Sequence, residues 1–177
     1  MKGGRPFRLF LSGFLACGKT TVGRVLARDL RLPFMDLDQT LVEEEGMPIL
    51  ELMVARGEPY FRRRERSLLE RLGNSENLIV ATGSGTPAIP ENLSLIGRLG
   101  EMVFLNAAWE TIAARLQEKK DLFPPNLPVE ALYRAYLERL PYYRQARWIL
   151  VPESGETPDA LALRIRLMIK GALPCAI

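Results

Sequence analysis

The segment Gly13-Phe14-Leu15-Ala16-Cys17-Gly18-Lys19-Thr20 matches the pattern G-x-x-x-x-G-K-S/T of a phosphate-binding loop, or P-loop. In such a loop glycines let backbone N–H groups surround a polyphosphate, the lysine carries a positive charge to the outer phosphates, and the threonine offers a hydroxyl to Mg²⁺. An apolar run over residues 8–12 is typical of a buried strand, and apolar residues at helical spacing follow from Val22 to Leu30. This order of strand, loop and helix favours a phosphate site over a chance glycine-rich turn.

The composition is that of one globular domain covering residues 1–177. The 177 residues are 47% hydrophobic, and no apolar run reaches the length of a membrane span. No hydrophobic signal region follows the N-terminus, and two cysteines are too few for a disulfide framework. We therefore expect a cytoplasmic protein that does not bind a membrane.

The charges limit the possible partners and chemistry. A formal charge of +3 from scattered basic residues is weak evidence for nucleic acid, so we expect a monomer that binds small molecules and no nucleic acid. The chain contains no histidine, which excludes a Ser–His–Asp triad and any histidine-ligated metal. Acid–base work must then fall to carboxylates, lysine or the substrate itself.

Four further strands are predicted, and helical patterns separate them. Strands are expected over residues 33–36, 77–82, 102–105 and 148–151. Alternation of strands and helices predicts a five-stranded parallel sheet in a three-layer α/β/α P-loop fold. Residues 119–128, which contain three prolines and no periodicity between two helices, are predicted to form a mobile lid.

Charged residues after the second strand suggest a ligand site. Asp36 and Asp38 alternate on what we expect to be an extended segment, so both carboxylates could face one cleft. Alternatively, Asp38 caps the helix expected over residues 40–45, and the two roles can coexist. Further along, Arg62 and Glu65 share a helical face at a spacing of three, whereas residues 63, 64 and 66 are expected to be solvated arginines.

Taken together and in order, these motifs resemble the shikimate kinase family, which belongs to the P-loop kinases similar to nucleoside monophosphate kinases. The matching stretches are the P-loop, residues 34–38, residues 57–65, residues 81–85 and residues 139–143. The resemblance covers nearly the whole chain. It implies an enzyme that transfers the γ-phosphate of ATP to the 3-hydroxyl of shikimate, giving shikimate 3-phosphate and ADP.

The resemblance also implies a role for each matching residue. It assigns Thr20 and Asp36 to Mg²⁺, with the aspartate reaching the ion through water, and it assigns Lys19 and Asp38 to catalysis. Glu65 orients the arginines, and residues 151–158 lie near adenine. ATP is expected to contact Gly13, Ala16, Cys17, Gly18, Lys19, Thr20, Thr21 and Arg115. Shikimate is expected to contact Asp38, Arg62, Gly83, Ser84, Gly85 and Arg139.

Two departures from the family pattern leave alternatives open. The family usually has a third glycine where this chain has Ser84, which costs roughly 1–2 kcal/mol if that position needs a positive φ and little if it does not. Phe123 aligns with the arginine that closes the family's lid, and Lys119 or Lys120 could replace its charge.

Two other functions are therefore alternatives to that of a shikimate kinase. A gluconate-type kinase is disfavoured by the joint presence of Asp38, Arg62 and Arg139. A ligand-binding protein with reduced turnover is favoured by the missing lid arginine, and it is disfavoured by the intact Lys19 and Asp38.

Overall fold

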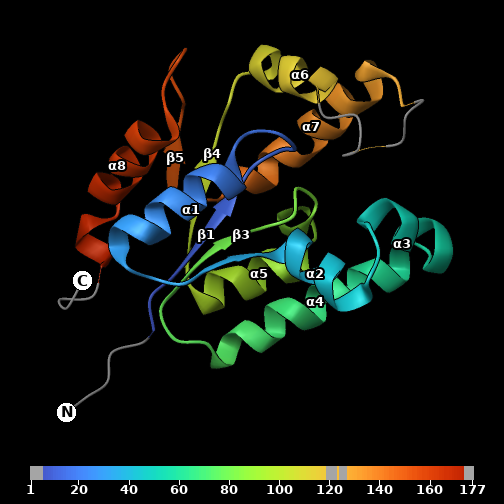
Figure 1. Cartoon of the computed structure of the whole chain (residues 1–177), viewed down its shortest axis with the longest axis horizontal. Coiled ribbons are helices and arrows are strands. Elements are labelled where there is room, and N and C mark those ends of the chain that lie inside the picture. Colours follow the sequence, from blue (N-terminus) through green and yellow to red (C-terminus); the bar gives the residue numbers. More distant parts are fainter. Residues whose placement is uncertain (1–5, 119–122, 124–126, 174–177) are drawn as a thin grey trace.

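The computed structural model describes residues 6–118, 123 and 127–173, and within them five parallel strands form one sheet (Figure 1). The spatial order of the strands is β2-β3-β1-β4-β5, which places the strand before the P-loop at the centre. The strands are β1 (Arg8–Ser12), β2 (Phe34–Asp36), β3 (Leu78–Ala81), β4 (Glu101–Leu105) and β5 (Trp148–Leu150). The predicted parallel sheet of a P-loop fold is confirmed.

Helices connect the strands and cover both faces of the sheet. The helices are α1 (Lys19–Leu30), α2 (Leu37–Glu45), α3 (Ile49–Arg56), α4 (Glu58–Arg71), α5 (Pro90–Leu99), α6 (Trp109–Glu118), α7 (Val129–Tyr143) and α8 (Pro158–Met168). Short 3-10 turns occupy Leu72–Asn74, Thr86–Ala88 and Lys170–Ala172. Most of the predicted lid, including Lys119 and Lys120, lies outside the described residues.

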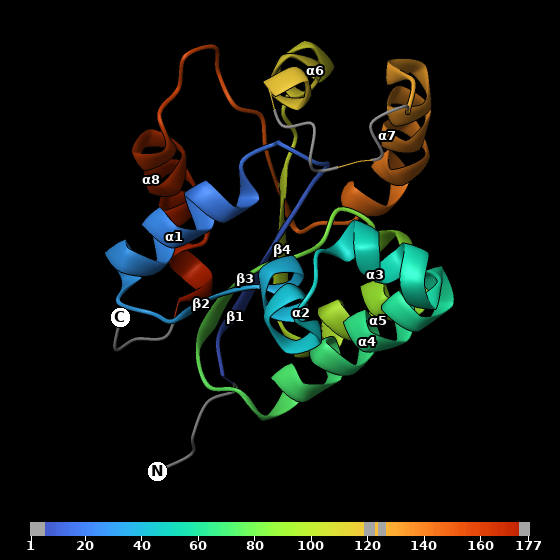
Figure 2. The ribbon, with the colours of Figure 1, turned by 45° about the vertical axis from the view of Figure 1, so that its right-hand side comes forward.

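The central strand divides its side chains between two cores. Leu9 and Leu11 face one core, where they pack with apolar residues of α1, α6, α7 and α8, and Phe10 faces the other core with residues of α2, α4 and α5. Figure 2 shows α1 and α8 on one side of the sheet and α4 and α5 on the other. Alternation along a strand buried on both faces produces this three-layer arrangement.

Because all strands run in the same direction, their carboxyl ends meet at one edge of the sheet, where ligands bind in open α/β folds. The P-loop follows β1 at this edge, α2 follows β2 without an intervening loop, and the turn Gly83-Ser84-Gly85 follows β3. Three segments that are far apart in the sequence are thereby brought to one side of the molecule.

Two expectations about side chains were wrong. The helix expected over residues 40–45 begins at Leu37, so Asp36 is its N-cap and Asp38 lies inside its first turn. Arg64 is not simply solvated, because its guanidinium forms ion pairs with Glu44, at 3.0 Å, and with Glu45 on α2. In the described part of the chain, no helix is both long and apolar enough to cross a membrane.

Candidate active site

The P-loop leads directly into α1, and its lysine, Lys19, is the first residue of that helix. Gly13 and Gly18 have φ angles of 142° and 105°, which residues with a side chain rarely adopt. The ammonium of Lys19 donates hydrogen bonds to the carbonyl oxygens of Gly13 and Phe14, both at 2.9 Å. A positive charge and the N-terminus of a helix therefore lie at the same place, which suits a bound polyphosphate.

A cavity of about 450 Å³, here named the P-loop cavity, opens over this loop. Its wall consists of residues 15–22 together with Asp36, Asp38, Thr82, Arg115, Glu118, Glu156, Pro158 and Leu161. Arg115 reaches the loop by donating to the carbonyl oxygen of Ala16 at 3.1 Å. Of the residues predicted to contact ATP, all but Gly13 line this cavity, and Gly13 instead accepts the bond from Lys19.

Cys17 is a filler of the loop rather than an exposed thiol. Its side chain is buried, and its sulfur lies 3.8 Å from the nitrogen of Lys19. A Cβ atom added at Gly13 would lie 2.8 Å from that sulfur, so the glycine and the cysteine pack closely.

Asp36 connects the P-loop to the start of α2. Its Oδ2 accepts a hydrogen bond of 2.5 Å from the hydroxyl of Thr20, and its Oδ1 accepts from the backbone N–H groups of Asp38 and Gln39 at 3.1 and 3.3 Å. A hydroxyl oxygen and a carboxylate oxygen are ligands that Mg²⁺ can bind. Among the described residues, no group of three or more acidic or cysteine side chains is placed to hold a metal ion.

Asp38 lies where two cavities adjoin. It lines the P-loop cavity and also a second cavity of about 410 Å³, named here the glycine-turn cavity; of the other lining residues only Leu15 is shared. Desolvation, helped by the nearby carboxylates of Asp36 and Glu65, raises the pKa of Asp38 to about 6 against the opposing positive charges of Lys19 and Arg62. Such a carboxyl group accepts a proton more readily than an exposed aspartate does.

The glycine-turn cavity is formed by segments that are distant in the sequence. Its wall consists of Leu15, Asp38, Gln39, Val42, Pro48, Ile49, Leu50, Met53, Phe61, Arg62, Glu65, Gly83, Ser84, Gly85 and Arg139. Apolar side chains from α2, α3 and α4 face polar groups from α4, α7 and the glycine turn. All of the residues predicted to contact shikimate line this cavity.

Arg62 is held in the cavity by two carboxylates. It forms ion pairs with Glu58 at 2.9 Å and with Glu65 at 3.0 Å, and Glu65 is 1% exposed. Glu65 also accepts a hydrogen bond from the buried hydroxyl of Thr86. Sequence reasoning missed Thr86, although its position directly after the glycine turn was a signal that could have indicated it.

The glycines of the turn are required by space rather than by φ. A Cβ atom at Gly83 would lie 2.6 Å from Oδ1 of Asp38, and one at Gly85 would lie 2.9 Å from Nη1 of Arg62. Among the described residues, only Ala16 and Arg31 have a positive φ without being glycine, so Ser84 has ordinary φ. The open question about Ser84 is thereby answered, because the serine carries no backbone penalty.

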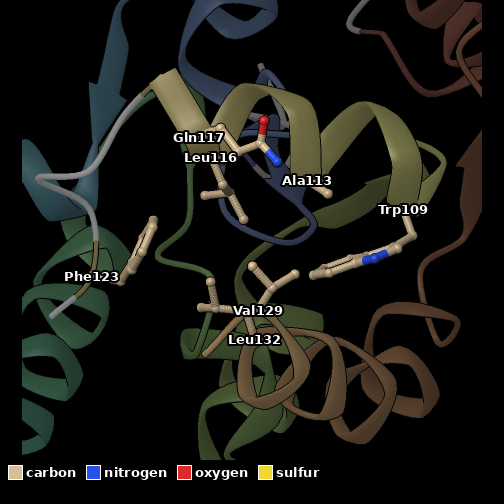
Figure 3. A pocket seen from close by; sticks show the side chains of 7 residues that line it. All are labelled: Trp109, Ala113, Leu116, Gln117, Phe123, Val129 and Leu132. Atoms are coloured by element: carbon tan, nitrogen blue, oxygen red, sulfur yellow. The ribbon is translucent and has the colours of Figure 1, made fainter. Parts of the chain in front are cut away.

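Phe123 lies apart from both of these cavities. It lines an apolar cavity of about 210 Å³ between α6 and α7, together with Trp109, Ala113, Leu116, Gln117, Val129 and Leu132. Figure 3 shows its ring at the opposite end of this cavity from Trp109. Phe123 packs against the core on the α1 side of the sheet. It therefore packs as an apolar group there, and its expected alignment with the lid arginine of the family stays a prediction.

The comparisons with known proteins agree with this geometry. The family model described as shikimate kinase matches residues 15–170. The shikimate kinase of Sulfurihydrogenibium sp. (strain YO3AOP1) is 35% identical over 162 residues, which are 92% of this chain and 97% of that protein. This chain belongs to the shikimate kinase family.

Solved shikimate kinases have the same fold. The enzyme of Acinetobacter baumannii, solved in complex with shikimate, superposes with a TM-score of 0.87 at 28% identity, covering 96% of each chain. The enzyme of Bacteroides thetaiotaomicron superposes with a TM-score of 0.82 at 31% identity, covering 93% of this chain and 98% of that one. The predicted family and the ATP-dependent kinase activity on shikimate are thereby confirmed.

Proposed function

We propose that this shikimate kinase binds ATP in the P-loop cavity and shikimate in the glycine-turn cavity, and that the phosphoryl group passes between them beside Asp38. The position of Asp38 in the walls of both cavities is the observation that carries this proposal. A group that lines both cavities can contact a phosphate acceptor on one side while facing the donor on the other.

ATP recognition is assigned to the P-loop and to two segments that face it. Backbone N–H groups of residues 13–21 surround the phosphates, and Lys19 neutralises their outer oxygens. Arg115 lies beside Ala16 on one side of the cavity, and Glu156 and Pro158 line another part of it. We place adenine between Arg115 and the loop over residues 151–158.

The donor set at the P-loop fits a magnesium ion. Thr20 and Asp36 would hold it, because their oxygens are 2.5 Å apart beside the loop and Mg²⁺ in kinases is completed by substrate phosphates and water. When bound, the ion would neutralise negative charge on the phosphate oxygens of ATP.

Side chains of opposite charge recognise the carboxylate of shikimate and its ring hydroxyls. Arg62 and Arg139, whose planar guanidinium groups match a carboxylate, bind its carboxylate. Asp38 accepts hydrogen bonds from its ring hydroxyls, and the backbone of residues 83–85 supplies further donors. The apolar wall that includes Val42 and Met53 contacts the ring.

In the transfer step, the 3-hydroxyl oxygen of shikimate attacks the γ-phosphorus of ATP. A bond forms between this oxygen and the phosphorus, the bond from phosphorus to the β–γ bridging oxygen breaks, and ADP leaves with that oxygen. The hydroxyl proton passes to the carboxylate of Asp38, whose raised pKa makes it a competent acceptor. Lys19 balances the negative charge on the transferred group.

We further propose a monomer that works in the cytoplasm without nucleic-acid or membrane partners. The low formal charge of +3 and the two cysteines support this assignment. Gel filtration of the purified enzyme should give the mass of one chain, and a dimer mass would contradict it.

A coupled assay of ADP release tests the proposed function. The purified enzyme should release ADP with shikimate in the presence of ATP and Mg²⁺, and at least about a hundredfold more slowly with gluconate or other polyhydroxy acids. The matched control is Lys19→Ala, which keeps the glycine-turn cavity. Equal turnover of gluconate would indicate a gluconate-type kinase, and no turnover of any acid would favour a ligand-binding protein.

A further inference from the structure

Ser84 contacts α7 through both its side chain and its backbone. Its hydroxyl accepts a hydrogen bond of 2.9 Å from Nη1 of Arg139, and its carbonyl oxygen accepts one of 2.5 Å from the hydroxyl of Tyr143. Arg139 and Tyr143 are four residues apart on α7, so they lie on one face of that helix. Burial raises the pKa of Tyr143, and this tyrosine therefore remains a hydrogen-bond donor.

The middle position of the turn is the one that can carry a side chain. Added Cβ atoms at Gly83 and Gly85 would meet Asp38 and Arg62 at less than 3.0 Å, as described above. Ser84 has ordinary φ, and its side chain reaches Arg139 instead. Three successive residues of the turn thus lie beside Asp38, Arg139 and Arg62 in that order.

The two arginines of the cavity are held in different ways. Arg62 is paired with two carboxylates, and its charge is largely balanced before any ligand binds. Arg139, within the described residues, forms no ion pair; it contacts the hydroxyls of Ser84 and Tyr143 and the ring of Phe14, whose centroid is 5.5 Å from its guanidinium carbon. Two neutral hydroxyls and an aromatic face fix its position, and no carboxylate of the described residues balances its positive charge.

We propose that the hydroxyl of Ser84 is a positioning group that holds Arg139 ready for the carboxylate of the substrate. The proposal rests on the proposed function, because it assumes that Arg139 binds that carboxylate. Ser84, the residue that departs from the three-glycine pattern, orients Arg139 without neutralising its positive charge. Preorganisation of this kind raises affinity by reducing the ordering that binding requires.

Calorimetric titration with shikimate tests the proposal. Ser84→Ala and Ser84→Gly remove one hydrogen bond to a charged group, and each should weaken shikimate binding about three- to tenfold with ATP affinity within twofold. The matched control is Ser12→Ala, which removes a buried hydroxyl bonded to the Val103 carbonyl at a position that lines neither cavity. This control should bind shikimate as the wild type does.

Two further titrations separate positioning from a merely structural role. The methyl ester of shikimate lacks the carboxylate charge, and Ser84→Ala should change its affinity less than twofold. In an Arg139→Ala background, Ser84→Ala should have no further effect, since the two groups act together. Equal losses of affinity in both backgrounds would overturn the proposal.

Titration of Arg139→Ala with shikimate separates a failure of the role of Ser84 from a failure of the assignment of Arg139. If it loses shikimate affinity while Ser84→Ala and Ser84→Gly bind normally, the role of Ser84 is wrong and the proposed function stands. If Arg139→Ala itself binds shikimate with wild-type affinity, the assignment of Arg139 and the role of Ser84 both fail.

Discussion

The P-loop cavity and the glycine-turn cavity adjoin each other but are built differently. One continuous stretch, residues 15–22, supplies half of the wall of the P-loop cavity, and its contacts to a ligand come largely from backbone and helix geometry. The glycine-turn cavity takes its wall from the P-loop, α2, α3, α4, the turn after β3, and α7. A local motif thus forms a general phosphate site, whereas a site for one particular acid requires the assembled fold.

The electrostatics of the two cavities differ as well. In the P-loop cavity the ammonium group of Lys19 donates hydrogen bonds to backbone carbonyls, so it can turn toward a bound phosphate. The glycine-turn cavity fixes its charges in a network, in which Glu58 and Glu65 hold Arg62 and Ser84 holds Arg139. This difference predicts that substitutions in the first cavity change chemistry and those in the second change recognition.

Lys19→Ala should have the largest effect. Turnover should fall on the order of 10³-fold or more, because the lysine neutralises the transferred phosphoryl group from the first residue of α1, outside the hydrophobic core. Thermal unfolding should stay within a few degrees of the wild type. Steady-state ADP release checks the rate, and turnover within a few-fold of the wild type would remove the P-loop from the mechanism.

Asp38→Asn should come next, because it affects the group common to both cavities. An amide of the same size cannot accept the hydroxyl proton, so kcat should fall on the order of 10²–10³-fold. The KM for shikimate should change much less, since the amide still forms hydrogen bonds. A proportionate rise in KM at constant kcat would make Asp38 a binding group only.

Arg62→Ala and Arg139→Ala should differ in stability rather than in affinity. Each should weaken shikimate binding roughly ten- to a hundredfold, at about 1.5–3 kcal/mol per charge-assisted contact. Only Arg62→Ala leaves a buried carboxylate, that of Glu65, without its partner, so it alone should lower the free energy of unfolding, by about 2 kcal/mol. Denaturant unfolding compares them, and equal losses of stability would contradict the asymmetry.

Phe123→Ala should have the smallest effect on either ligand. The ring packs in the apolar cavity between α6 and α7, outside both ligand cavities, so the free energy of unfolding should fall by about 1–2 kcal/mol. The KM values for ATP and shikimate should stay within twofold. A tenfold rise in the KM for ATP would show that Phe123 does act on the nucleotide.

Features that depend on neighbours in the sequence were predictable. Strand β1 occupies the predicted residues 8–12, and helices alternate with the strands along the chain as predicted. The P-loop, which combines backbone freedom with a fixed spacing, was recognisable for the same reason. The residues expected on the substrate side also share one cavity, as their family pattern suggested.

Features that depend on contacts across the fold were not predictable. Asp36 rather than Asp38 caps α2, because the helix follows the strand without a loop and the first free carboxylate reaches the exposed N–H groups. Arg64 finds two carboxylates on α2, and Thr86 finds Glu65 on α4, and neither pairing has a local signal. Whether Ser84 needed a positive φ could be decided only from the backbone itself.

One set of titrations tests the separation of the two cavities most directly. Lys19→Ala and Arg139→Ala are each titrated by calorimetry with ATP in the presence of Mg²⁺ and with shikimate. Lys19→Ala should lose affinity for ATP and bind shikimate within twofold of the wild type. Arg139→Ala should show the reverse, with a ten- to hundredfold loss for shikimate only. If either variant loses affinity for both ligands to the same degree, the two cavities do not have separate ligands and the central claim is wrong.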